Sequence, residues 1–261
     1  MTTSAPPGLD PSLLGEGQAR DARFTVKELW AELVNHADGT PEHRREFLHR
    51  QMNEEANVME NAAQSLVDFP DADWGIRMWL ARQCSDEARH VLFYSRLMRA
   101  RGVRIGEYPV LNFQYRVLRQ INTLIGRLAV ENRTFEADGL DAVTLGVREA
   151  EAMGDDAMTR MLEAQQADEI VHVGFANEWI RRQVGQDPRN VLRMATALTH
   201  AARAFQVVFA RGGTEVSKYP VAQAERLEAG FDPDEVRRAA EMSTARRAAV
   251  EASRKAITPG T

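Results

Sequence analysis

One short pattern of metal-ligating residue types occurs twice in this chain. Residues 83–90 read QCSDEARH and residues 165–172 read QQADEIVH, so Gln, Asp, Glu and His recur at the same positions 82 residues apart. A Glu and a His that are three residues apart lie on one face of a helix, where both can reach the same metal ion. The repeated pattern therefore predicts four metal ligands, which are Glu87, His90, Glu169 and His172.

Each Glu–His pair lies on a stripe of residues at helical spacing that is mostly apolar. The stripes also contain Ile76, Leu80, Tyr94 and Leu97 in the first segment, and Met158, Leu162, Ala176 and Trp179 in the second. Ionisable side chains on such a stripe are costly to bury unless they are paired or bind a metal. The alternative interpretation is two buried Glu–His ion pairs without a metal. A third pair at this spacing, Glu46 and His49, lacks the outer Gln and Asp.

Two metal ions need further oxygen ligands, which we expect from two other long helices. Glu55 interrupts an otherwise apolar stripe in the first of them. In the second helix the apolar stripe points at Glu131, whereas symmetry with the spacing of Glu55 and Glu87 selects Glu136. We favour Glu136, with Glu131 as the alternative, because irregular helical turns are common at functional sites and can redirect a side chain.

Two aspartates are predicted to support these ligands from outside. Asp86 and Asp168 each directly precede a ligand Glu. Carboxylates around metal sites often hold the ring N–H of a ligand His, and we expect each Asp to do so for the opposite His.

Long segments without proline must position these residues. They lack the alternation and turn residues of strands, so they predict an all-α fold. The helices are predicted over 24–36, 40–67, 74–101, 110–138, 155–183, 189–211 and 233–255. Residues 1–22 are predicted to be a disordered arm, 23–256 a single helical domain and 257–261 a tail.

Composition limits the classes of protein that fit. The 261 residues include 33 basic and 38 acidic side chains, a net charge of −5 that argues against a nucleic-acid partner. A single cysteine, Cys84, excludes an internal disulfide and a Cys-based metal site. The sequence has no secretory leader pattern and no run of about 18 apolar residues, so we expect a cytoplasmic protein without a membrane segment.

The sequence resembles the ferritin-like superfamily and, more narrowly, a bacterial ferritin-like family first described as a domain of unknown function. The resemblance rests on DEARH (86–90), FEADGLDAV (135–143), DEIVHV (168–173) and KYPVAQAERLEAGF (218–231). It implies a ferritin-like four-helix bundle with additional N- and C-terminal helices. It also implies a dinuclear iron site, and it aligns the Glu of FEADGLD with Glu136.

The ligand chemistry suggests the activity. Four carboxylates balance the charge of two Fe²⁺ ions, and their hard oxygen atoms stabilise Fe³⁺. We expect an O₂-activating di-iron oxygenase or oxidase that hydroxylates or N-oxygenates a small organic substrate, including substrates of secondary metabolism. Two Fe ions are the expected cofactor, a Mn/Fe pair is the alternative, and O₂ is the co-substrate. Iron storage or detoxification, or peroxide reduction, are the alternative functions.

The expected partners follow from the same chemistry. No Gly-rich dinucleotide fingerprint follows a strand, so electrons must come from an external ferredoxin or reductase. A small organic molecule is the expected substrate, and a homodimer is considered. Neither nucleic acid nor a membrane is an expected partner.

Overall fold

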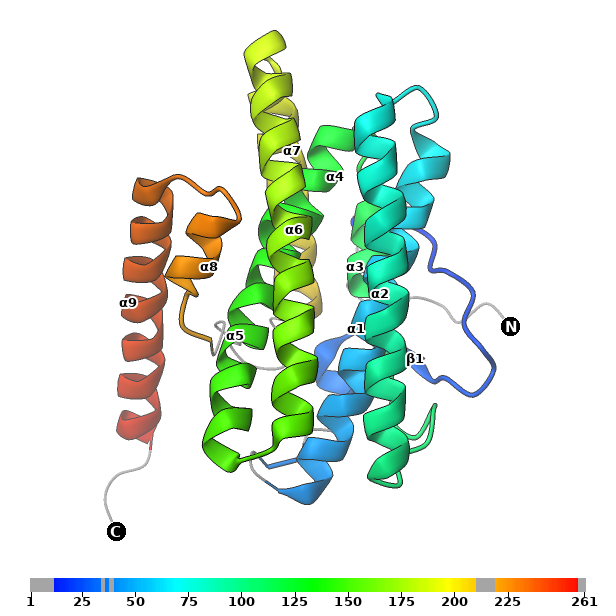
Figure 1. Cartoon of the computed structure of the whole chain (residues 1–261), viewed down its shortest axis with the longest axis vertical. Coiled ribbons are helices and arrows are strands. Elements are labelled where there is room, and N and C mark those ends of the chain that lie inside the picture. Colours follow the sequence, from blue (N-terminus) through cyan, green and yellow to red (C-terminus); the bar gives the residue numbers. More distant parts are fainter. Residues whose placement is uncertain (1–11, 34–35, 38–39, 210–218, 258–261) are drawn as a thin grey trace. The chain divides into compact units, whose positions relative to one another are not determined.

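A computed structural model describes residues 12–33, 36–37, 40–209 and 219–257 (Figure 1). Apart from one two-residue strand pair and the loops, these residues are helical, so the predicted all-α class is confirmed. None of the helices in this described part is both long and apolar enough to span a membrane. The chain divides into two compact units, residues 1–131 with 183–213 and residues 132–182 with 214–261, and each is described by itself.

The first unit is built on a helical hairpin. Helix α1 (Pro41–Asp68) and helix α2 (Trp74–Ala100) pack along each other (Figure 1). A side chain caps the first turn of each helix: the Thr40 hydroxyl accepts a hydrogen bond from the His43 N–H, and the Asp73 carboxylate accepts one from the Ile76 N–H. Their facing sides bury apolar residues, including Leu48, Met52, Ile76, Leu80 and Met98. Helices 40–67 and 74–101 are therefore confirmed within the usual variation of helix ends.

Polar contacts hold the N-terminal segment on α1. Gln18 donates to Asn57 and Glu60, and Arg20 forms an ion pair with Glu60. Leu14 is buried as well. Residues 12–22 thus differ from the disordered arm that the sequence predicted, because α1 presents polar partners that complement this segment. Residues 1–11 of the predicted arm lie outside the described residues.

The predicted helix over 24–36 is wrong. Strand β1 (Val26–Lys27) pairs in parallel with strand β2 (Val110–Leu111), and a 3₁₀ turn, η1 (Trp30–Glu32), follows. The Val110 N–H donates to the Thr25 carbonyl, which fixes this segment in an extended form. The partner strand lies more than 80 residues away in the chain, so no local pattern indicated the pairing.

The predicted helix over 110–138 is broken into several elements. After β2 come α3 (Phe113–Leu118), α4 (Leu124–Val130), a π-helical segment η2 (Glu131–Phe135) and α5 (Glu136–Met153). Thr123 begins α4 by accepting a hydrogen bond from the Gly126 N–H. Helix α5 runs through Gly139, just beyond the end of the predicted helix, because the buried residues Ala137 and Leu140 hold it in the core on either side.

Helix α5 ends at Gly154, which has a φ of +69°. Glycine adopts this left-handed conformation without the steric cost that other residues meet, and it commonly terminates helices. The chain then enters α6 (Asp156–Gln186), in agreement with the predicted helix over 155–183.

Helix α7 (Asn190–Phe209) completes the first unit and confirms the prediction over 189–211 as far as residue 209, the last described residue there. It packs against α4. A Cβ atom at Gly126 of α4 would lie 2.9 Å from the Ala197 Cβ, so only glycine allows this close approach.

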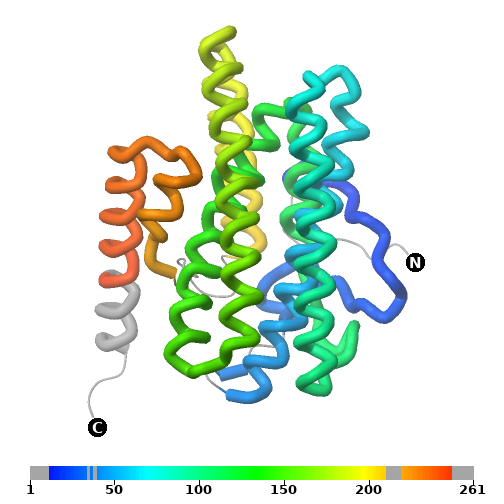
Figure 2. Tube along the Cα trace, viewed as in Figure 1, coloured from blue at the N-terminus to red at the C-terminus, as the bar shows by residue number. Residues whose placement is uncertain are grey.

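The second unit has its own core between α5, α6 and the C-terminal helices α8 (Gln223–Glu228) and α9 (Pro233–Ile257). Helix α9 confirms the prediction over 233–255, whereas α8 was not predicted. The core contains Leu140, Val143, Val147, Leu162, Val173, Ala229, Phe231 and Val236. Helix α8 contacts both α5 and α9, and Figure 2 shows it beside α9.

A buried arginine fastens α8 to α5. Arg226 contacts both carboxylate oxygens of Asp141 at 2.9 and 2.7 Å, and it also donates to the Ala137 carbonyl. Asp141 further accepts the Ala222 N–H. Arg226 lies in the KYPVAQAERLEAGF segment, so this contact gives that segment a structural role.

We expect Arg226→Ala to lower the free energy of unfolding by about 3 kcal/mol, because it leaves the buried Asp141 carboxylate without its cation. Arg237→Ala is the control, since its ion pair with Asp234 is exposed on both sides and should contribute little. Urea titrations of both variants measure the difference. Equal losses of free energy of unfolding in the two variants would mean that the buried Arg226–Asp141 pair does not hold α8 in place.

Candidate metal centre

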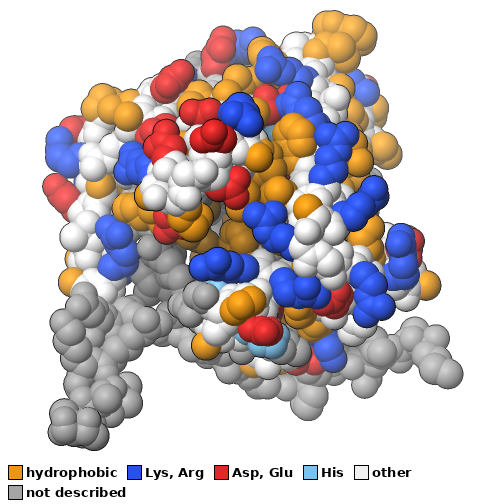
Figure 3. Space-filling model, turned by 60° about the horizontal axis from the view of Figure 1, so that its bottom comes forward, with side chains coloured by type: hydrophobic (Ala, Val, Ile, Leu, Met, Phe, Trp, Pro, Cys, Tyr) orange, Lys and Arg blue, Asp and Glu red, His pale blue; other side chains and the backbone are white. Residues whose placement is uncertain are grey.

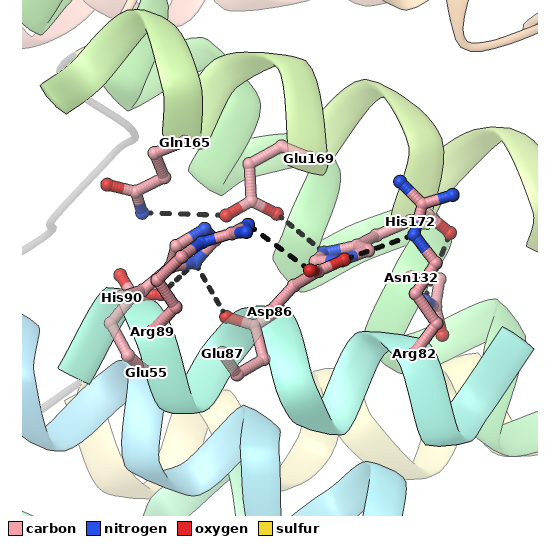
Figure 4. Close-up of polar contacts among 10 residues, drawn as sticks. All are labelled: Glu55, Arg82, Asp86, Glu87, Arg89, His90, Asn132, Gln165, Glu169 and His172. Atoms are coloured by element: carbon pink, nitrogen blue, oxygen red, sulfur yellow. Dashed lines mark hydrogen bonds and ion pairs between the residues drawn. The ribbon is translucent and has the colours of Figure 1, made fainter. Parts of the chain in front are cut away.

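The first unit brings three predicted ligands together. Glu55 comes from α1, and Glu87 and His90 come from consecutive turns of α2 (Figure 4). The His90 Nδ1 atom lies 2.9 Å from Glu87 Oε2 and 3.2 Å from Glu55 Oε2. Each of the three offers a ligand atom within 4.8 Å of the other two, and all three are buried. We call Glu55, Glu87 and His90 the first half-site.

Burial in the first half-site disfavours the charged form of Glu55. It raises the pKa of Glu55 from its ordinary 4.5 to about 7, and the neighbouring Glu87 carboxylate adds to the rise. The hydrogen bond from His90 opposes this change in pKa. A bound cation would remove the cost, because it stabilises the carboxylate directly.

This raised pKa makes the stability of the metal-free protein depend on pH. Protonated Glu55 contributes to the free energy of unfolding, and this contribution is present in full below its ordinary pKa of 4.5. The contribution is lost as the pH rises through about 7, because the folded state then has to hold a buried charge. Glu55 alone should lower the free energy of unfolding by roughly 2 kcal/mol between pH 5 and 7.5.

Urea titrations of the metal-free protein at both pH values measure this change, and Glu55→Gln should reduce it by that amount. If the free energy of unfolding changed equally with pH in Glu55→Gln and in the parent protein, ionisation of Glu55 would not destabilise the folded state.

Asp86 occupies the outer edge of the first half-site. Its carboxylate accepts from Arg89 at 3.2 Å and lies 3.4 Å from Arg82, both on its own helix (Figure 4). These arginines anchor the aspartate next to the candidate ligand Glu87. The predicted contact of Asp86 with the opposite His remains a prediction, as does the role of Asp168 on α6.

The second unit brings the other three predicted ligands together. Glu136 is the first residue of α5, and Glu169 and His172 lie one turn apart on α6. Each offers a ligand atom within 4.8 Å of the other two, and all are buried. The His172 Nδ1 atom lies 3.4 Å from Glu169 Oε2. We call Glu136, Glu169 and His172 the second half-site.

Two amide side chains support the second half-site (Figure 4). Asn132 donates to the His172 carbonyl oxygen at 3.1 Å, and Gln165 lies 3.5 Å from the Glu169 carboxylate. Gln165 belongs to the repeated sequence pattern, whereas nothing in the sequence indicated Asn132.

The two candidate carboxylates around η2 have different surroundings. Glu131, at its start, accepts a hydrogen bond from Asn61 of α1 at 3.1 Å within the first unit. Glu136 follows directly after its end and lies with Glu169 and His172. The π-helical turn is the irregularity that the choice of Glu136 required, because an extra residue in a turn rotates the following side chains.

The third Glu–His pair of the sequence is structural. Glu46 accepts the His36 backbone N–H, and the buried His49 Nε2 accepts the Gly106 N–H at 2.8 Å. Burial lowers the pKa of His49 to about 4, so this imidazole is neutral near pH 7. Glu46 and His49 therefore each accept a backbone N–H from a loop residue, which is a structural role.

Each half-site has the donor set of a divalent metal ion. When a metal binds, two ionised carboxylates and one imidazole contribute two negative charges, which one divalent cation balances. Mixed oxygen and nitrogen donors suit iron, manganese or zinc, whereas Ca²⁺ and Mg²⁺ prefer oxygen alone. The buried carboxylate and histidine groups can thus hold metal.

Comparison with known proteins identifies one family. A family model described as a protein of unknown function, DUF455, matches residues 16–237, which include both half-sites. No curated protein and no solved structure matches the chain significantly.

Proposed function

The chain belongs to the DUF455 family of proteins of unknown function, and from this premise we propose that it is an O₂-dependent oxidoreductase of the ferritin-like superfamily. Its proposed activity is the hydroxylation or N-oxygenation of a small organic substrate. The observation that carries the proposal is the pair of half-sites, each with two buried carboxylates and one buried histidine.

From the repeated ligand pattern of the sequence we propose that the six residues bind two metal ions. Three side chains alone give a metal ion few ligands, but a carboxylate has two oxygens and can be shared by two ions. The half-sites have the same ligand set, and their Glu-x-x-His pairs recur 82 residues apart. Such a pair from each of two helices, with one Glu from each of two others, is the ligand arrangement of di-iron and di-manganese bundles.

Iron is the metal that best fits the proposed chemistry, with a Mn/Fe pair as the alternative. The four carboxylates carry four negative charges, which two Fe²⁺ ions balance in a buried site. Oxygen donors also stabilise Fe³⁺, so the same ligands suit both oxidation states. Zinc fits the donors but has no redox chemistry.

The residues around the proposed centre position its ligands and exclude water. Glu87, His90 and His172 are fully buried, and Asn132 and Gln165 orient the second half-site. Glu55, Glu87, His90, Glu136, Glu169 and His172 would hold two iron ions, which would supply the redox chemistry for O₂. Hydroxylation or N-oxygenation places one oxygen atom in the product and the other in water, and it consumes two electrons and two protons from outside. An external electron donor, a ferredoxin or a reductase, is therefore part of the proposal.

Anaerobic loading with Fe²⁺ followed by exposure to O₂ tests this function. We expect rapid O₂ consumption, with about two iron ions per chain remaining bound after oxidation, as measured by an oxygen electrode and by iron analysis after desalting. Absence of O₂ consumption would contradict the proposal. Accumulation of many iron atoms per chain would favour storage instead.

A further inference from the structure

The outward side of α2 carries a strip of exposed arginine and apolar side chains. Its members follow one another at three- or four-residue spacing, which places them on one face of the helix. They are Trp74, Met78, Arg82, Ser85, Arg89, Leu92, Arg96 and Arg99. All are exposed, and we call them the α2 strip. Figure 3 shows basic side chains interleaved with hydrophobic ones on the right of the face that it draws.

The charge of the α2 strip has one sign. Arg82, Arg89 and Arg96 recur every seven residues, about 10 Å along the helix. The strip contains no acidic residue; the exposed Asp73 precedes its first member, and the buried Asp86 contacts Arg82 and Arg89. Arg96 and Arg99 form no ion pair with any residue in the described part of the chain. The strip is therefore positively charged although the chain has a net charge of −5.

The same helix carries two ligands of the first half-site on its other side. Glu87 and His90 are buried, whereas Arg89, between them in sequence, faces outward. A helix with its side chains is about 10–12 Å across. A protein bound to the α2 strip would thus be separated from the first half-site by the thickness of one helix.

We propose that the α2 strip is the docking surface for an acidic one-electron carrier protein. The inference rests on the proposed function, since only a redox centre needs such a partner. Charge complementarity between arginines and an acidic patch speeds encounter and sets orientation. The exposed Trp74, Met78 and Leu92 add apolar contact area, and Trp, Met and Arg are enriched in protein interfaces.

Two other occupants fit the α2 strip less well. A second copy of the chain would place arginines opposite arginines, because the same strip of both copies would meet in a two-fold symmetric interface. A nucleic acid would meet the net negative charge of the chain beyond the strip, and the apolar members of the strip would gain no phosphate contact.

The electron count matches a one-electron carrier. Two reduced carrier molecules dock in turn, each gives up one electron and is oxidised, and two Fe³⁺ ions held by the half-sites become Fe²⁺. These two electrons are the ones that the proposed oxygenation consumes.

Calorimetric titration with an acidic [2Fe–2S] ferredoxin tests the docking surface on the full chain, both metal-free and metal-loaded. We expect R96E/R99E to weaken the affinity at low salt about tenfold or more. The control is R148E/R160E, which makes the same charge change at two exposed arginines of α5 and α6 that also form no ion pair within the described residues. The control should bind within about twofold of the parent protein, and added salt should weaken parent binding.

Equal affinities of the two variants would overturn the docking surface. Tighter binding of a short RNA duplex than of ferredoxin, lost in R96E/R99E, would overturn it in favour of a nucleic acid. Dithionite as a chemical reductant separates the two proposals. If dithionite supports O₂ consumption and the affinity for ferredoxin is unchanged in R96E/R99E, only the docking surface fails. If no metal binds but ferredoxin still docks through the strip, only the proposed function fails.

Discussion

Glu87→Ala and His172→Ala should each abolish O₂ consumption by the iron-loaded protein. Each variant removes a buried candidate ligand from a different half-site, and the affected half-site then keeps only two of its three side chains. The proposed chemistry needs both metal ions, so the loss of one should stop turnover and not merely slow it. Metal content should fall from about two ions per chain to one or fewer. Iron analysis and an oxygen electrode measure the two effects.

The matched control is Glu54→Gln, next to the ligand Glu55 in sequence but half-buried and outside the first half-site. It should keep both metals and the activity. Circular dichroism verifies that the variants remain helical. A His172→Ala protein that is folded and consumes O₂ at the parent rate would contradict the assignment of the second half-site.

Glu136→Ala and Glu131→Gln should have opposite outcomes, although both residues flank the same π-helical segment. Glu136 lies with Glu169 and His172, so its loss should remove metal from the second half-site and abolish O₂ consumption. Glu131 is held by Asn61, and a glutamine there can still accept that hydrogen bond. Glu131→Gln should therefore keep both metals. Metal analysis of the two purified variants measures the difference.

The reverse pattern, with metal lost in Glu131→Gln and kept in Glu136→Ala, would show that the apolar periodicity of the sequence had indicated the right ligand. Deletion of Thr134 within η2 gives an independent check. Removing one residue from the π-helical turn rotates Glu136 by about 100° about the helix axis, and metal binding at the second half-site should be lost.

Local patterns predicted the long helices because their signals are local. The Thr40 and Asp232 side chains cap α1 and α9 within one turn, and the apolar stripes of α1, α2 and α6 extend over many turns. The elements that the sequence missed depend on distant partners. Strand β1 forms because Val110 and Leu111 pair with it, and α8 is fixed by the contact of Arg226 with Asp141.

The six candidate ligand residues could be selected from the sequence because their types recur at fixed spacing. Symmetry selected Glu136, which lies with Glu169 and His172, whereas periodicity selected Glu131; a π-helical turn breaks the 3.6-residue repeat between the two. The supporting residues were harder to find. Asn61 and Asn132 are single amides whose roles follow from contacts with residues 40 or more positions away.

Metal analysis of the purified, iron-loaded chain tests the central claim most directly. Two half-sites with four carboxylates and two histidines predict about two iron ions per folded chain, by plasma emission spectrometry with protein quantified by amino-acid analysis. Glu54→Gln should give the same value and Glu87→Ala a lower one. A folded parent chain that retains no iron, or only one ion, after loading and desalting would contradict the dinuclear centre.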